Sequence, residues 1–197
     1  MARPDAARRP PAGYAPVLAR ETLQARVAEL GAELARALKP RERPVAVVVL
    51  QGAFVFAADL LRHVPHSTGL EVAFLRCESY GAATRSRGRV LLLQDLDQAL
   101  DLHGRTVVLV DDILDSGLTL KYLVRHLKAR GAARVKVCVL LKRKAGGARA
   151  VRADYVGFEI GPEFVAGYGM DHAGKFRHVP DLWAVKPARR RGARARR

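Results

Sequence analysis

Apolar residues in this sequence fall into two patterns, which are short apolar runs and longer stretches with a helical period. The short runs predict six strands, at residues 45–50, 70–77, 90–94, 106–110, 135–141 and 155–160. The runs at 45–50 and 106–110 are apolar on both faces of the strand, as expected for parallel strands that helices cover on both sides. These two runs are therefore predicted to be central strands of a sheet.

The second pattern predicts helices. Residues 18–38 form an amphipathic helix that ends at Lys39-Pro40, since its apolar residues recur at near-helical spacing: Leu23, Val27, Leu30, Leu34 and Leu38. Two further helices are predicted over 53–63 and 120–130. The alternation of strands and helices indicates an α/β fold with a mostly parallel central sheet. The intervening segments are predicted as a long mobile loop, a basic loop and a mostly irregular stretch, at 78–88, 142–150 and 161–175.

Carboxylates and hydroxyls follow the strand at 106–110 directly. Asp111 and Asp112 come first, Asp115 lies three residues on, and the loop Ser116-Gly117-Leu118-Thr119 opens the next helix. Open α/β sheets bind ligands at the carboxyl ends of their strands. Hydroxyls, a glycine and free N–H groups at a helix start form a cradle that suits a phosphate. A phosphate cradle beside two carboxylates predicts a site for a phosphorylated sugar, whereas the competing interpretation is a solvated acidic turn.

Residues 106–119 resemble the phosphoribosyl-pyrophosphate signature of the type I phosphoribosyltransferases. The form Asp-Asp-Ile-Leu-Asp-Ser-Gly resembles the hypoxanthine–guanine branch in particular, and the resemblance extends over roughly residues 20–185. It implies the type I phosphoribosyltransferase fold, in which N- and C-terminal segments form a small hood. It also implies a purine salvage enzyme that joins hypoxanthine or guanine to phosphoribosyl pyrophosphate with Mg²⁺, releasing pyrophosphate and forming IMP or GMP.

The resemblance implies a role for each residue of the signature. Asp111 and Asp112 hold the ribose hydroxyls and Mg²⁺ or its waters, and Asp115 is the general base or acid for N7 of the purine. The 5′-phosphate lies in the cradle formed by Asp115, Ser116, Gly117, Leu118 and Thr119.

Further segments resemble the pyrophosphate site and the lid of this family. Gln51 and Gly52 match the pyrophosphate loop, where the resemblance implies a cis peptide after Leu50, and Arg177 is implied as a cation near the pyrophosphate. Many relatives carry Lys at position 51, so Gln51 removes one cation from this site. Ser79 and Tyr80 correspond to the working end of a lid that excludes water from the reaction centre.

The purine site is implied by residues 157–171. Phe164 stacks on the base, backbone groups of Val165 read its edge, and Asp171 is a further ligand of Mg²⁺. The family usually places a Lys after the strand at 135–141 to contact the 6-oxo group. Ungapped alignment puts Arg143 at this position, and a shift of one residue would select Lys142 or Lys144 instead.

Composition bounds these expectations. The chain has 197 residues, 49% of them hydrophobic, which suits one domain over 18–185 between a loose extension at 1–17 and a disordered arginine-rich tail at 186–197. No run of about 18 apolar residues is present, and the first eleven residues lack an apolar h-region, so we expect neither a transmembrane helix nor secretion. Two cysteines, Cys77 and Cys138, provide no disulfide framework, so we expect a cytoplasmic protein without a membrane partner.

The net charge of +16 leaves two alternatives open. The tail contributes seven positive charges, and it is either a solubilising segment or a site for RNA and other polyanions. An RNA-binding regulator on the same fold is therefore the alternative function. A binding module that has lost catalysis is suggested only by Gln51 and the basic residues at 142–144. The sequence does not rank hypoxanthine, guanine and xanthine as substrates. It also does not decide between the homodimer and the homotetramer that the resemblance implies.

Overall fold

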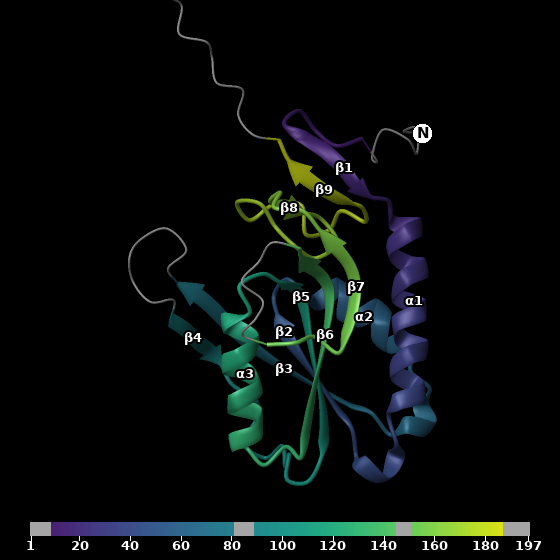
Figure 1. Ribbon diagram of the computed structural model, residues 1–197, viewed down its shortest axis with the longest axis vertical. Coiled ribbons are helices and arrows are strands. Elements are labelled where there is room, and N and C mark those ends of the chain that lie inside the picture. The colour runs from purple at the N-terminus through teal and green to yellow at the C-terminus, as the bar shows by residue number, and fades with distance from the viewer. Residues whose placement is uncertain (1–8, 81–88, 145–150, 187–197) are drawn as a thin grey trace, which may run out of the picture.

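A computed structural model describes residues 9–80, 89–144 and 151–186. Its main body is a sheet of six strands in the order β4-β3-β2-β5-β6-β7 (Figure 1). The strands are β2 (Val45–Leu50), β3 (Glu71–Tyr80), β4 (Arg89–Gln94), β5 (Thr106–Leu114), β6 (Arg134–Arg143) and β7 (Tyr155–Ile160). Only β4 runs antiparallel to its neighbour in this sheet. The prediction of an α/β fold with a mostly parallel central sheet is confirmed.

Helices cover the sheet on both faces. Helices α1 (Arg20–Ala37) and α2 (Phe54–Arg62) pack on one face, and α3 (Leu118–Ala129) packs on the other (Figure 1). Successive residues of the central strands serve the two cores, since Val48 and Val110 pack with α1 and α2, whereas Val47 and Leu109 pack with α3. This double burial explains why the strands read as unbroken apolar runs. Two short 3₁₀ helices complete this body, at Pro40–Glu42 and His66–Thr68.

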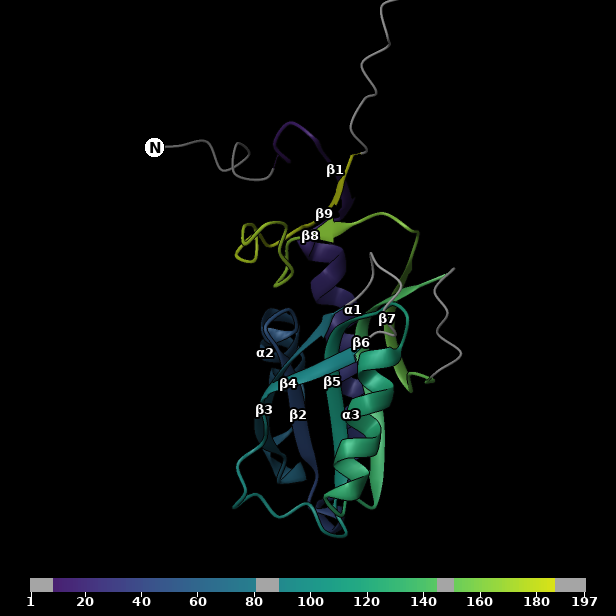
Figure 2. The ribbon, with the colours of Figure 1, turned by 90° about the vertical axis from the view of Figure 1, so that its left-hand side faces the viewer.

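A smaller antiparallel sheet forms the hood, stacked on the carboxyl-end edge of the parallel strands (Figure 2). It consists of β1 (Tyr14–Leu18), β9 (Leu182–Val185) and β8 (Val165–Ala166), in the order β1-β9-β8. The expected hood of N- and C-terminal segments is confirmed. The expectation of a loose extension over 1–17 is wrong for its last part, because residues 14–18 pair with β9. Residues 1–8 and 187–197 lie outside the described part of the chain.

Two polar contacts fasten the hood to the body. The backbone N–H of Arg20, at the start of α1, donates to Asp181 Oδ1 at 2.8 Å, while the N-cap residue Ala19 makes no side-chain cap. The hydroxyl of Tyr168 donates to Asp59 Oδ2 at 2.7 Å, and burial together with this carboxylate raises the pKa of Tyr168. The hood is therefore held at a fixed place over the strand ends.

Several elements are longer than predicted. β5 continues from residue 110 to Leu114, so the carboxylates Asp111 and Asp112 belong to the strand itself. β3 extends to Tyr80 and β6 to Arg143. Residues 78–80 and 142–143, which were expected in the loops at 78–88 and 142–150, therefore belong to strands. The rest of these loops, 81–88 and 145–150, lies outside the described residues. No helix within the described ranges is long and apolar enough to cross a membrane.

Candidate active site

The strand order creates a switch point between β2 and β5. After β2 the chain crosses to β3 on one side, and after β5 it crosses to β6 on the other, so the two loops diverge at this edge. A cavity of about 740 Å³ opens there beneath the hood. It is lined by thirteen of the predicted site residues: Gln51, Gly52, Asp111, Asp112, Asp115, Ser116, Gly117, Thr119, Arg143, Phe164, Val165, Asp171 and Arg177. The sequence motifs thus meet in one place.

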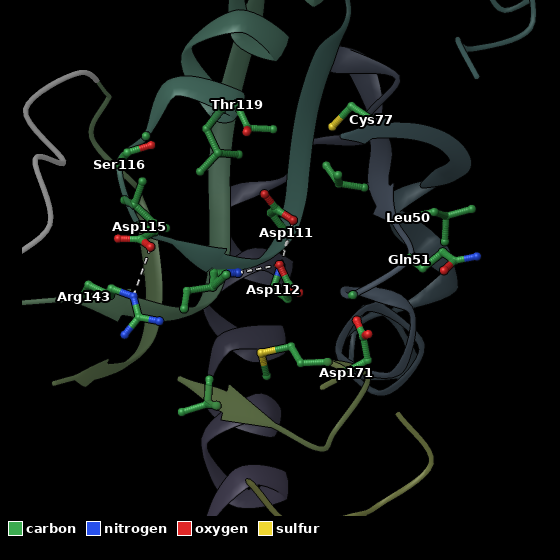
Figure 3. Close-up of a pocket in the computed structure, with 18 of the residues that line it drawn as sticks. Leu50, Gln51, Cys77, Asp111, Asp112, Asp115, Ser116, Thr119, Arg143 and Asp171 are labelled. Carbon is green, nitrogen blue, oxygen red and sulfur yellow. Dashed lines mark hydrogen bonds and ion pairs between the residues drawn. The ribbon is translucent and has the colours of Figure 1, made fainter. Parts of the chain in front are cut away.

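The carboxylates of Asp111 and Asp112 lie at the floor of the cavity, between Gln51 on one side and Asp115 on the other (Figure 3). Asp111 Oδ1 accepts the backbone N–H of Asp112 at 3.0 Å, and Asp112 Oδ1 accepts the N–H of Ile113 at 2.8 Å. Burial raises the pKa of Asp111 well above its usual range, and the neighbouring Asp112 raises it further. Burial also raises the pKa of Asp112, although the charge of Arg177 opposes this rise. A cation that binds beside these two carboxyl groups stabilises their charged forms.

Gly52 brings the loop after β2 against this pair. A Cβ at position 52 would overlap the carboxylate of Asp112, so any other residue must displace one of the two. The peptide between Leu50 and Gln51 is cis, as the resemblance implied. Gly169 of the hood packs in turn on the carbonyl of Gly52, where a Cβ would also overlap. The loop after β2 is therefore fixed between the strand β5 and the hood.

The loop at 115–119 forms the opposite wall. Gly117 has φ 76°, a left-handed conformation that favours glycine, and α3 begins at the next residue. Ser116, Gly117 and Thr119 line the cavity, whereas Leu118 does not. The N–H of Leu118 lies 3.4 Å from Ser116 Oγ, a weak contact that an anion can replace. The start of α3 thus offers the hydroxyls and N–H groups that a phosphate needs.

Arg143 joins the end of β6 to Asp115. Its Nε lies 3.2 Å from Asp115 Oδ2 (Figure 3). Its Nη1 donates to the carbonyls of Gly161 and Glu163 at 2.9 Å each. Neither neighbour of Arg143 in the basic run lines the cavity. Lys142, for example, pairs with Glu159 at 2.8 Å. Of the three basic residues that the alignment left open, Arg143 is the one in the cavity.

The hood supplies the remaining wall. Phe164 is 53% exposed and borders the cavity, and Val165 is buried in β8. Arg177 forms an ion pair with Asp171, and its Nη1 donates to the carbonyl of Gly169 at 2.9 Å. Asp171 therefore already has a cationic partner. Within the described residues, no group of three or more His, Cys, Asp or Glu side chains is placed to hold a metal ion, so the three predicted ligands do not form one cluster.

Comparison with known proteins agrees with this geometry. The sequence model of the phosphoribosyl transferase domain matches residues 15–173. Hypoxanthine-guanine phosphoribosyltransferase of Bacillus subtilis is 41% identical over 172 residues, which cover 87% of this chain and 93% of that protein. The chain belongs to the hypoxanthine-guanine phosphoribosyltransferase family.

Other members of the family support the assignment. The enzyme of Mycobacterium tuberculosis (strain H37Rv) is 38% identical over 176 residues, covering 87% of this chain and 85% of that protein. A crystal structure of hypoxanthine-guanine phosphoribosyltransferase from Bacillus anthracis, with HEPES in its active site, superposes with a TM-score of 0.79 at 38% identity. The matched region covers 87% of this chain and 98% of the Bacillus anthracis chain. The fold is therefore that of the type I phosphoribosyltransferases.

Seven residues that line the cavity were not among the predicted site residues: Val49, Leu50, Cys77, Ile113, Leu114, Leu120 and Met170. Cys77 of β3 lines the cavity, and burial together with the nearby carboxylates raises the pKa of its thiol to about 12, so the thiol is neutral. Met170 also lines the cavity from the hood. The sequence signal for Cys77 is its place at the end of the predicted strand at 70–77. Ser79 and Tyr80 lie in β3, where they pair with β4, and the structure describes their backbone alone.

Proposed function

We propose that this protein transfers the phosphoribosyl group of phosphoribosyl pyrophosphate to hypoxanthine or guanine, releasing pyrophosphate and forming IMP or GMP. One observation carries the proposal. The phosphate loop at the start of α3 and the carboxylate pair of β5 face a single cavity whose roof carries an exposed aromatic ring, Phe164. This arrangement suits a sugar phosphate on the body and a flat base under the hood.

The sugar and its phosphate occupy the body side. Asp111 and Asp112 hold the ribose hydroxyls, and the 5′-phosphate lies on the N–H groups and hydroxyls of residues 115–119. Mg²⁺ suits this place, because it uses one or two carboxylates and completes its shell with water and substrate oxygens. The charge of Asp112 helps to raise the pKa of buried Asp111, and a cation bound beside the pair offsets this repulsion. Asp171 is a further ligand only if its ion pair with Arg177 opens. When bound, Mg²⁺ neutralises charge on the leaving pyrophosphate.

The base occupies the hood side. Phe164 stacks on the purine, and backbone groups of Val165 read its edge. Arg143 donates to the 6-oxo group, while Asp115 accepts or donates the proton at N7. Two backbone carbonyls fix the guanidinium of Arg143 beside Asp115. The donor for the 6-oxo group and the carboxylate for N7 therefore lie next to each other. Most of the rate then comes from positioning and electrostatics.

The leaving group occupies the third side. Backbone groups of Gln51 and Gly52 bind the pyrophosphate, and Arg177 supplies positive charge across the cavity. Ser79 and Tyr80, at the end of β3, belong to the lid that excludes water while the C1 centre is exposed.

Initial rates test this function directly. Turnover of hypoxanthine, guanine and xanthine is measured with phosphoribosyl pyrophosphate and Mg²⁺, and adenine and uracil serve as controls. We expect turnover of 6-oxopurines only, and the relative rates will rank the three. If phosphoribosyl pyrophosphate binds but no base is turned over, the proposal is wrong. Salt-dependent RNA binding that is lost on truncation after Val185 would then favour the RNA-binding regulator.

The same proposal includes a homodimer. Val72 and Phe74 of β3 and Leu91 and Leu93 of β4 lie on one face of the sheet and are each 45–52% exposed. Arg76 and Glu78, an ion pair on the same strand, give this face both signs of charge, which suits a second copy related by a two-fold axis. Sedimentation equilibrium should show a dimer that Phe74→Ser weakens, whereas Val17→Ser, on an exposed residue of the hood, leaves it intact.

A cytoplasmic location also belongs to this proposal. Its support is that both cysteines, Cys77 and Cys138, are free thiols, as is usual in a reducing compartment. Fractionation of the native host should place the activity with cytoplasmic enzymes.

A further inference from the structure

The half-exposed ring of Phe164 rests against a second ring of the hood. The centroids of Phe164 and His172 are 5.3 Å apart and their planes meet at 53°. Within the described residues, His172 is the one aromatic neighbour recorded for Phe164. Because more than half of the Phe164 side chain is exposed, few other contacts restrict the angle at which this ring meets the cavity. The orientation of His172 therefore bears on the orientation of Phe164.

A hydrogen bond fixes His172 in turn. The hydroxyl of Tyr14 lies 2.6 Å from His172 Nδ1, and the two rings meet edge-on with centroids 5.8 Å apart. Tyr14 is itself held in an aromatic cluster, since its ring lies 5.0 Å from that of Phe176 and 6.3 Å from that of Trp183. Trp183 is buried in β9. A continuous series of contacts thus runs from the buried part of the hood to the ring at the cavity.

The backbone around His172 leaves little other freedom. His172 and Lys175 exchange two backbone hydrogen bonds of 3.1 Å, and Gly174 N–H donates to Asp171 Oδ2 at 2.8 Å. This tight turn fixes the Cα of His172, so what remains free is the rotation of its side chain. The Tyr14 hydroxyl removes that rotation by engaging one particular ring nitrogen.

We propose that Tyr14 and His172 are positioning residues for the base, acting through Phe164. The inference rests on the proposed function, because it assumes that Phe164 stacks on a purine. A stacking ring that is held at its working angle before the base arrives loses less freedom on binding, so it binds the base more tightly. The strand β1 then contributes to recognition of the base as well as to the hood.

Kinetics of Tyr14→Phe test this role, because the substitution removes the hydroxyl and keeps the ring in its aromatic cluster. We expect the KM for hypoxanthine to rise about 2- to 12-fold, the range of one neutral hydrogen bond. The KM for phosphoribosyl pyrophosphate and the kcat should stay within twofold of the parent values. Tyr155→Phe is the matched control, since its hydroxyl contacts Lys136 on β6 outside the cavity.

A double-mutant cycle separates positioning from general destabilisation. His172→Ala should raise the KM for hypoxanthine at least as much as Tyr14→Phe, and adding Tyr14→Phe to it should cause no further rise. Fold-changes that multiply in the double variant overturn the inference, as does an unchanged KM in Tyr14→Phe. If the parent protein turns over no purine at all, the proposed function fails and this inference fails with it. An active parent with an indifferent Tyr14→Phe variant overturns the inference alone.

Discussion

The guanidinium of Arg143 and the carboxylate of Asp115 form an ion pair of 3.2 Å between the end of β6 and the loop that opens α3. Only 14% of the Arg143 side chain is exposed, against 61% for Asp115. The arginine is therefore the fixed member, anchored on the carbonyls of Gly161 and Glu163, and the aspartate is the member free to move. A base that enters the cavity meets a rigid donor beside a mobile carboxylate.

Asp115→Asn tests the mobile member. We expect the fold and the KM for phosphoribosyl pyrophosphate to be retained, because the amide keeps the shape of the carboxyl group. Turnover should fall by up to about 10²-fold, since asparagine cannot exchange a proton with N7. Steady-state kinetics measure this, with Asp97→Asn, on an exposed turn away from the cavity, as the control. Unchanged turnover would exclude Asp115 as the general base or acid.

Arg143→Ala tests the fixed member. Removing the guanidinium takes a charged donor from the cavity and leaves two carbonyls without this partner, so kcat/KM for hypoxanthine should fall by about 10- to 150-fold, the range of one charged hydrogen bond. Lys142→Ala is the matched control, because it removes an adjacent cation that pairs with Glu159 outside the cavity. A larger loss for Lys142→Ala than for Arg143→Ala would mean that the purine contact lies at a different residue.

Much of the architecture could be predicted from local sequence. The bounds of β2 and β7 agree with the predicted runs at 45–50 and 155–160, because buried strands need unbroken apolar residues. The carboxylates of β5 were assigned to the site because ligands bind at strand ends, a rule that needs no knowledge of distant residues.

The features that were missed depend on distant partners. β1 carries a proline and exposed residues, and it becomes a strand only through β9, more than 160 residues later in the sequence. The ion pair between Asp115 and Arg143 likewise joins two strand ends that the sheet brings together. Neither relationship leaves a pattern in the local sequence.

Gly52→Ala tests the close approach of the loop after β2 to β5. An alanine Cβ would overlap the carboxylate of Asp112, so either the loop or that carboxylate must move. We expect kcat/KM for phosphoribosyl pyrophosphate to fall at least about tenfold, since a misplacement of about 1 Å at a reaction centre costs up to about 10²-fold. Circular dichroism should still show a folded protein. Unaltered kinetics would show that Asp112 can move without consequence.

The buried carboxyl of Asp111 predicts how stability depends on pH. Burial and Asp112 raise its pKa in the folded state above the ordinary value near 4 of the unfolded chain. In the window between these values the folded state binds more protons at Asp111 than the unfolded state, so the contribution of Asp111 to stability is most favourable below pH 4 and falls as the pH rises through the window. Asp111→Asn carries no charge at any pH, so it should avoid this loss.

Thermal unfolding in a chelator without substrate measures the effect. At pH 7.5 the midpoint for Asp111→Asn should exceed that of the parent, by about 2–4 °C for each kcal/mol of stabilisation, and the two should converge near pH 4. Activity of the variant should fall, because an amide holds a cation and ribose hydroxyls less well than a carboxylate. The lower stability of the parent at pH 7.5 is the expected cost of keeping a buried carboxyl group where the ligand needs it. A variant that is less stable than the parent at pH 7.5 would contradict the raised pKa, and would mean that an unseen contact holds Asp111 in its charged form.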